Sequence, residues 1–184
     1  MTTVRLRQVT VVQGSYAIGT KSDDVLITIL GSCVATCLWD PVARIGGLNH
    51  FLLPEGRGAD QASLKYGLNL MELLLNALLK GGARRDRLQG KLFGGARMIT
   101  GMTNIGALNG AFAERFLTEE GIPIVAKSIG GERARKLRFW PNSGRAQQML
   151  LARTLGDTQL LSSGTADAPV TQAVAVGSGD VDLF

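Results

Sequence analysis

The stretch that decides the fold is VLITILGSCVATCLWDPVARIGGLNHFLL, residues 25–53. Its first six residues are apolar or β-branched and predict a short buried strand. Two further apolar runs flank the segment Asp40–Arg44, which begins with Asp-Pro, a common start of a turn. The stretch therefore predicts a buried strand that leads directly into a β-hairpin over residues 33–53.

The hairpin has a predicted register that brings two reactive side chains together. If Asp40 pairs with Ile45 across a four-residue loop, Ala35 faces His50. Cys33 lies on the same face as Ala35, because side chains alternate along a strand. Cys33 and His50 are then diagonal neighbours about 7–8 Å apart at the backbone, within side-chain reach. A slip of one residue would put them on opposite faces.

The remaining chain predicts two helices and several more strands. Leucines and a methionine recur every three or four residues over Ala62–Lys80, and a second helix is expected over Ala107–Glu120 after Asn104. An edge strand is expected near the start of the chain, and the other predicted strands cover residues 88–93, 124–129, 134–140 and 147–153. These elements predict an α/β sandwich in which two main helices pack against one mixed sheet.

Composition favours a single folded domain with an acidic end. Of the 184 residues, 45% are hydrophobic and 19% are charged, which excludes a mainly disordered chain. We expect a domain over residues 1–156 and a mobile tail over residues 157–184. The tail has four acids and no Lys or Arg, so the net charge of +5 corresponds to +9 on residues 1–156. No apolar run predicts a membrane span or an export signal, so we expect a cytoplasmic protein with reduced thiols.

A basic domain suggests an acidic partner surface. Nucleic acid is one candidate, through the clusters Arg84–Arg87 and Arg133–Lys136. Both clusters are short, however, and aromatic residues make up only 5% of the chain, too few for an evident base-stacking surface. The sequence therefore favours a partner other than nucleic acid.

The segment Gly31-Ser32-Cys33 ends the buried strand and is the candidate for chemistry. A thiol at such a bend can be presented beside backbone N–H groups, as a cysteine nucleophile with an oxyanion hole requires. His50 is the only histidine and so the only imidazole base. The alternative of a small core cysteine and a structural histidine stays open. Cys37 is expected in the core, and two Cys with one His match no zinc pattern, so we expect no metal site.

Two further features have both a functional and an ordinary interpretation. Thr28 could orient the imidazole through its hydroxyl, or be a plain β-branched strand residue. The doublet Gly94-Gly95 could line a site that a substrate chain approaches closely, or simply form a turn. No nucleotide-binding glycine pattern is present.

Several ordered motifs resemble the CheD family, the chemoreceptor glutamine deamidases of bacterial chemotaxis. The resemblance extends over about residues 11–153 and is carried by five motifs: LGSCVATCLWDP at 30–41, GGLNHFLLP at 46–54, KLFGGARM at 91–98, NIGALN at 104–109 and GGERAR at 130–135.

The resemblance implies a three-layer α/β sandwich that hydrolyses receptor glutamine side chains to glutamate and ammonia. It implies Cys33 as nucleophile, His50 as general base and Thr28 as the orienting threonine, and we expect Gly31, Ser32, Gly94 and Gly95 to contact the substrate. No cofactor is expected. The implied partners are chemoreceptor cytoplasmic helices and a CheC-type phosphatase. Receptor methyl-ester hydrolysis and a non-catalytic adaptor remain alternatives.

Overall fold

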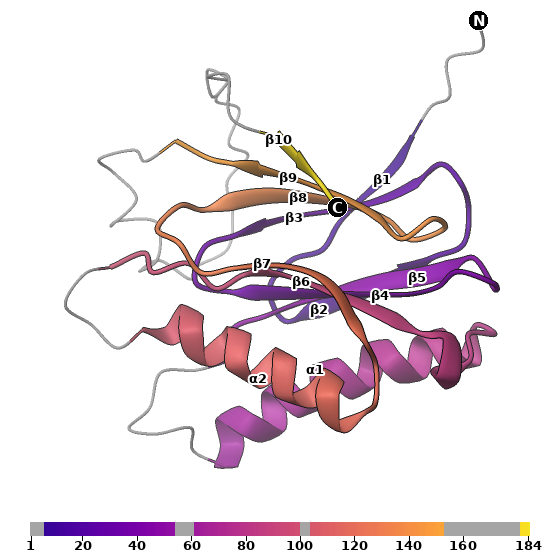
Figure 1. The fold of residues 1–184 in the computed structure, drawn as a ribbon, viewed down its shortest axis with the longest axis horizontal. Helices are drawn as coiled ribbons and strands as arrows, with labels where there is room; N and C mark the ends of the chain where they lie inside the picture. The colour runs from indigo at the N-terminus through magenta and orange to yellow at the C-terminus, as the bar shows by residue number, and fades with distance from the viewer. Residues whose placement is uncertain (1–5, 54–60, 100–103, 153–180) are drawn as a thin grey trace, which may run out of the picture.

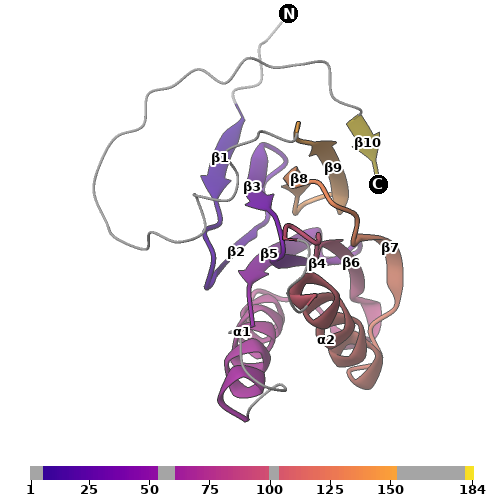
Figure 2. The same cartoon turned by 90° about the vertical axis from the view of Figure 1, so that its left-hand side faces the viewer.

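Three layers make up the protein in the computed structural model, which describes residues 6–53, 61–99, 104–152 and 181–184. Within these residues, ten strands form two five-stranded sheets, and two helices cover the outer face of one sheet (Figure 1). The view along the strands in Figure 2 shows the order sheet, sheet, helices. The predicted α/β sandwich with two main helices is confirmed. The single sheet is wrong, because the strands divide between two sheets.

Sheet A is the sheet farther from the helices. Its strand order is β1-β3-β8-β9-β10, and β1 runs parallel to β3 while the other neighbours are antiparallel. In that order its strands are Arg7–Thr10, Asp24–Leu30, Arg135–Trp140, Arg145–Leu150 and Val181–Leu183. The predicted edge strand and the predicted buried strand therefore pair with each other.

Sheet B lies between sheet A and the helices. Its strand order is β2-β5-β4-β6-β7, with a parallel pairing only between β6 and β7. In that order its strands are Ser15–Gly19, Ile45–Phe51, Val34–Asp40, Gln89–Gly94 and Ile124–Ile129. The predicted hairpin is the pair β4 and β5 at the centre of this sheet.

Helices α1 (Gln61–Lys80) and α2 (Ile105–Glu119) pack their apolar faces on sheet B, and a short 3-10 turn, Arg85–Arg87, follows α1. Asn104 begins α2 as its cap, since its Oδ1 accepts a hydrogen bond from the Ala107 N–H at 3.1 Å. Both predicted helices are confirmed. None of the described helices is long and apolar enough to cross a membrane.

Two separate cores follow from strand alternation. One fills the space between the helices and sheet B, and the other fills the space between the two sheets. On β3, Leu26, Thr28 and Leu30 point toward sheet B, and on β5, Leu48 and His50 point toward sheet A. A threonine and a histidine therefore face each other inside an otherwise apolar layer.

Asp40 fixes the hairpin turn between β4 and β5. Its buried carboxylate accepts hydrogen bonds from the backbone N–H groups of Val42 and Ala43 at 2.8 and 2.9 Å. It also accepts from the backbone N–H of Arg84 and from Arg87 Nε, both at 2.9 Å. These donors hold the pKa of Asp40 at about 2 against the effect of burial. An ionised aspartate thus ties the turn to the segment after α1.

The end of the predicted tail belongs to sheet A. Val181–Leu183 forms β10, which pairs with β9, and the Phe184 ring packs edge-on against Phe93 with centroids 5.3 Å apart. A mobile tail is therefore wrong for these last residues, whose short strand is stabilised by pairing and by aromatic burial. Residues 153–180 of the predicted domain end and tail lie outside the described residues. The division at residue 156 stays a prediction.

Candidate active site

The hairpin register matches the sequence prediction residue by residue. Asp40 pairs with Ile45, and Ala35 pairs with His50. His50 is 6% exposed and points into the layer between the sheets, the same side as Ala35 and Cys37. The predicted pairing of Ala35 with His50 is therefore confirmed, and the predicted approach of the Cys33 and His50 side chains stays a prediction.

Cys33 lies at the bend where β3 leaves sheet A and β4 enters sheet B. Its side chain is half-buried against the edge of the core between the sheets. Its thiol donates a hydrogen bond to Gln13 Oε1 at 3.5 Å. Cys37 is fully buried, as predicted, and burial raises the pKa of its thiol strongly. Of the two cysteines, only Cys33 is placed to react.

Thr28 and His50 are joined by a hydrogen bond between the two sheets. Thr28 Oγ1 lies 2.8 Å from His50 Nδ1 and donates to the Val11 carbonyl oxygen at 2.8 Å. Nδ1 also lies 3.3 Å from that carbonyl. The hydroxyl has one proton and the carbonyl can only accept, so the consistent assignment puts a proton on Nδ1, which donates to Thr28 Oγ1.

This tautomer leaves the other ring nitrogen as a lone-pair base. Among the residues that the structure describes, none forms a hydrogen bond with His50 Nε2, which is buried. A buried nitrogen without a partner is energetically unfavourable. Such groups are rare in native proteins and are found where they have a role, such as accepting a proton during a reaction. The imidazole is thus held at Nδ1, and its Nε2 has no partner in the described part of the chain.

Both candidate reactive groups are neutral at rest. Burial lowers the pKa of His50 below its ordinary 6.5, and the Val11 carbonyl offsets only part of this effect. Burial raises the pKa of the Cys33 thiol above its ordinary 9.0, against the opposing effect of the backbone at Gly31 and Cys33 itself. Both shifts favour the uncharged forms of the thiol and the imidazole in the resting protein.

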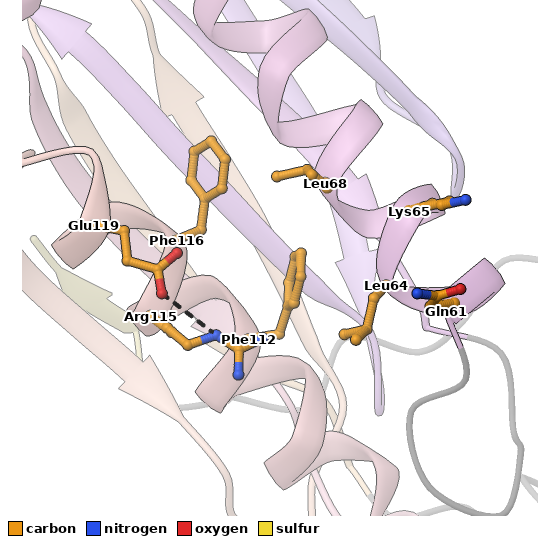
Figure 3. Close-up of a pocket in the computed structure, with 8 residues that line it drawn as sticks. All are labelled: Gln61, Leu64, Lys65, Leu68, Phe112, Arg115, Phe116 and Glu119. Atoms are coloured by element: carbon orange, nitrogen blue, oxygen red, sulfur yellow. Dashed lines mark ion pairs between the residues drawn. The ribbon is translucent and has the colours of Figure 1, made fainter.

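Two other observations bear on what the site can hold. Among the described residues, no cluster of three or more His, Cys, Asp or Glu could bind a metal ion. A groove of about 230 Å³ lies between α1 and α2, in the helical layer (Figure 3). It is lined by Gln61, Leu64, Lys65, Leu68, Phe112, Arg115, Phe116 and Glu119. None of the candidate catalytic side chains reaches it.

Comparison with known proteins is decisive on the family. The model of CheD chemotactic sensory transduction matches residues 52–149, more than half of the chain. A protein of Acidiphilium cryptum is 52% identical over 182 residues, which cover 97% of this chain and 94% of the relative. A protein of Agrobacterium fabrum is 48% identical, and the match covers 97% of this chain and 97% of the relative. A protein of Caulobacter vibrioides is also 48% identical, and the match covers 98% of this chain and 95% of the relative. This chain belongs to the CheD family.

All three relatives are named "Probable chemoreceptor glutamine deamidase CheD". The family model begins after Cys33 and His50, whereas the relatives match over nearly the full chain. The CheD resemblance inferred from the motifs is therefore confirmed. The roles of individual residues stay predictions that the geometry above has to support.

The glycines predicted as CheD substrate contacts surround the Cys33 backbone. The Gly95 N–H donates to the Cys33 carbonyl at 2.8 Å, and the Ala96 N–H donates to the Gly31 carbonyl at 2.9 Å. Gly94 has φ +114°, and a Cβ there would lie 2.1 Å from the Cys33 carbonyl oxygen. Gly94 and Gly95 thus hold the Cys33 backbone closely, and their contact with a substrate remains a prediction.

Two site residues were missed by sequence reasoning. Asn109 is fully buried on α2, donates to the Ser32 carbonyl at 2.9 Å and accepts from the Leu53 N–H at 2.9 Å. It lies in the NIGALN motif of the CheD family, which was the signal that could have found it. Gln13, which contacts Cys33, carries no signal in the sequence.

Proposed function

We propose that this CheD-family chain is a protein-glutamine deamidase that converts selected glutamines of chemoreceptors, the methyl-accepting chemotaxis proteins, to glutamate. The relatives' names supply the substrate class. The observation that carries the chemistry is the Thr28–His50 hydrogen bond. It leaves one imidazole nitrogen without a partner among the described residues, in the layer against which Cys33 packs.

The first half of the reaction forms a thioester. His50 Nε2 takes the proton of the Cys33 thiol as the sulfur attacks the carboxamide carbon of the substrate glutamine. The carbonyl oxygen becomes an oxyanion, which backbone N–H groups at the Gly31–Cys33 bend stabilise. The protonated imidazole then gives its proton to the departing nitrogen, and ammonia leaves.

The second half of the reaction releases the product. His50 Nε2 takes a proton from water, the hydroxide attacks the thioester carbon, and the sulfur leaves and recovers the proton from the imidazole. The balance is one carboxamide and one water to one carboxylic acid and one ammonia. No cofactor or metal enters these steps.

The charge distribution supports an acidic helical partner. Residues 1–156 have a net charge of +9 once the four acids of residues 157–184 are set apart. Receptor helices that gain glutamates would be attracted to such a surface. In this proposal the enzyme works in the cytoplasm at the receptor arrays, and a CheC-type phosphatase is its regulatory partner.

Ammonia release from a purified receptor cytoplasmic fragment tests the proposal. The wild type is expected to release ammonia and to convert glutamine to glutamate in the fragment's mass spectrum, and Cys33→Ala is expected to do neither. Methanol release from a methylated fragment would identify the esterase alternative, which uses the same thioester. Binding without any turnover would identify the adaptor alternative and contradict the proposal.

A further inference from the structure

The turn between β1 and β2, residues 11–14, touches every candidate catalytic residue. The Val11 carbonyl accepts from Thr28 and lies beside His50 Nδ1. The Gly14 N–H donates to the His50 carbonyl at 2.7 Å. Gln13, between them, places its side-chain amide against the Cys33 sulfur. One short turn thus forms a wall of the site.

The backbone on both sides of Gln13 is fixed. The Val11 N–H donates to the Ile27 carbonyl at 2.8 Å, which ties the turn to β3. Gly14 has φ +81°, and a Cβ at this position would lie 2.8 Å from the Tyr66 hydroxyl. The Gln13 side chain itself is exposed, so only its own torsions decide where the amide points. A fixed backbone and a side chain that can rotate suit a group that hydrogen-bonds an atom whose position changes during a reaction.

We propose that Gln13 is a further catalytic residue, whose side-chain amide donates a hydrogen bond to the oxyanion that forms beside Cys33. The inference rests on the proposed deamidase function. At rest, the thiol proton is donated to Gln13 Oε1 over 3.5 Å. Once this proton has moved to His50, the sulfur can no longer donate, and the contact with an amide oxygen becomes unfavourable.

Rotation about the last torsion of Gln13 then presents Nε2–H instead of Oε1. That torsion is soft and roughly two-fold, so the exchange of oxygen for nitrogen requires no change in the backbone. The oxyanion is bonded to the carbon that the sulfur attacks, so it forms close to the sulfur, and in this proposal it forms on the side that Gln13 faces. A neutral donor stabilises the developing negative charge and does not add a charge of its own.

Two other roles of Gln13 predict different results. As a place-holder for the substrate's carboxamide, it would compete with substrate, and its removal would raise activity. As a substrate of its own enzyme, it would be deamidated and the purified protein would carry a glutamate in its place. The observed contact is a hydrogen bond through the amide oxygen and not an approach of sulfur to the carbonyl carbon, which attack requires. The geometry therefore favours the donor.

Turnover of the receptor fragment separates the three roles. Gln13→Ala and Gln13→Glu are expected to lower kcat about 10- to 100-fold with little change in KM. This is less than the roughly 100- to 1000-fold typical of one oxyanion donor, because the side chain is exposed. Gln8→Ala and Gln8→Glu are matched controls, since Gln8 is exposed on the neighbouring strand β1. An unchanged or increased kcat in Gln13→Ala would overturn the inference, as would deamidation of Gln13 in the purified wild type.

Alkylation of Cys33 by iodoacetamide tests the contact without any receptor. Gln13→Glu is expected to slow alkylation below pH 9 about fivefold, through the repulsion of two charges about 4 Å apart in water. Gln13→Ala is not expected to slow it, because this variant removes an acceptor that stabilises the protonated thiol. Identical rates in all three proteins would overturn the inference. If the wild type releases no ammonia while these rates differ as expected, the proposed function fails and the Gln13 contact stands.

Discussion

Thr28 Oγ1 lies 2.8 Å from His50 Nδ1, and this hydrogen bond joins β3 of sheet A to β5 of sheet B. Both side chains are buried in the apolar layer between the sheets. In such surroundings a hydrogen bond is strong, and the loss of either partner leaves a buried polar group unpaired. The contact therefore fixes both the position and the tautomer of the imidazole.

Substitution of Thr28 separates the hydroxyl from the shape of the side chain. Thr28→Val removes the donor and acceptor at nearly constant volume and is expected to lower kcat about tenfold or more, because the imidazole loses its orienting partner. Thr28→Ser retains the hydroxyl and is expected to keep most of the activity. The acid limb of the pH profile should move in Thr28→Val only. Equal activity of the two variants would contradict the role of the hydroxyl.

The pH dependence follows from the directions of two pKa shifts. His50 must be neutral to accept the thiol proton, and burial lowers its pKa, so the acid limb of kcat/KM is expected below pH 6.5. Cys33 and His50 must together retain one proton, which is given to the departing ammonia. Burial raises the pKa of Cys33, so this proton is lost, and the alkaline limb is expected, only above pH 9.0. A narrow optimum between these values would contradict a pair that is neutral at rest.

Asn109 links α2 to the backbone of Ser32, directly before Cys33. Asn109→Ala leaves the Ser32 carbonyl and the Leu53 N–H without this partner, and we expect it to destabilise the protein by about 1–3 kcal/mol and to lower kcat. Asn76→Ala, an exposed position on α1, is the matched control and is expected to change neither. Urea unfolding measures the first effect and ammonia release the second. An active, stable Asn109→Ala variant would contradict the link.

The free energy of unfolding is expected to fall at acidic pH because of Asp40. The folded pKa of about 2 lies below the ordinary 3.8, so this stabilisation is complete above pH 3.8 and disappears as the pH falls toward 2. Asp40→Ala is expected to cost about 2–4 kcal/mol at neutral pH, by leaving four donors unpaired. Asp86→Ala, which removes an exposed ion pair with Arg84, is the control and should cost under about 1 kcal/mol. A similar loss in both variants would contradict the role of the turn.

The local parts of the fold could be predicted from sequence because local chemistry determines them. The Asp-Pro turn sets the register of the hairpin, and the leucine spacing sets the length of α1. The division into two sheets could not be predicted, since β3 pairs with β8, more than 100 residues later, and no local pattern encodes that partner. Strand β2 was missed because its burial pattern is weak and does not alternate clearly.

The candidate site divides in the same way. Cys33 and His50 could be predicted as neighbours because the hairpin register follows from the local sequence, and Cys33 lies directly before β4. For Thr28 the residues alone left an orienting hydroxyl and a plain strand residue equally open, since Thr28 and His50 lie in different sheets. Gln13 and Asn109 reach the site from a turn and a helix whose positions depend on tertiary packing.

The most direct test of the Cys33–His50 mechanism is trapping of the thioester. The receptor fragment is mixed with the wild type, Cys33→Ala and His50→Ala, quenched in acid, and searched by mass spectrometry for a covalent adduct, in parallel with ammonia release. We expect an adduct on Cys33 in the wild type, none in Cys33→Ala, and ammonia release reduced about 100-fold or more in His50→Ala. Undiminished ammonia release by Cys33→Ala would contradict the account.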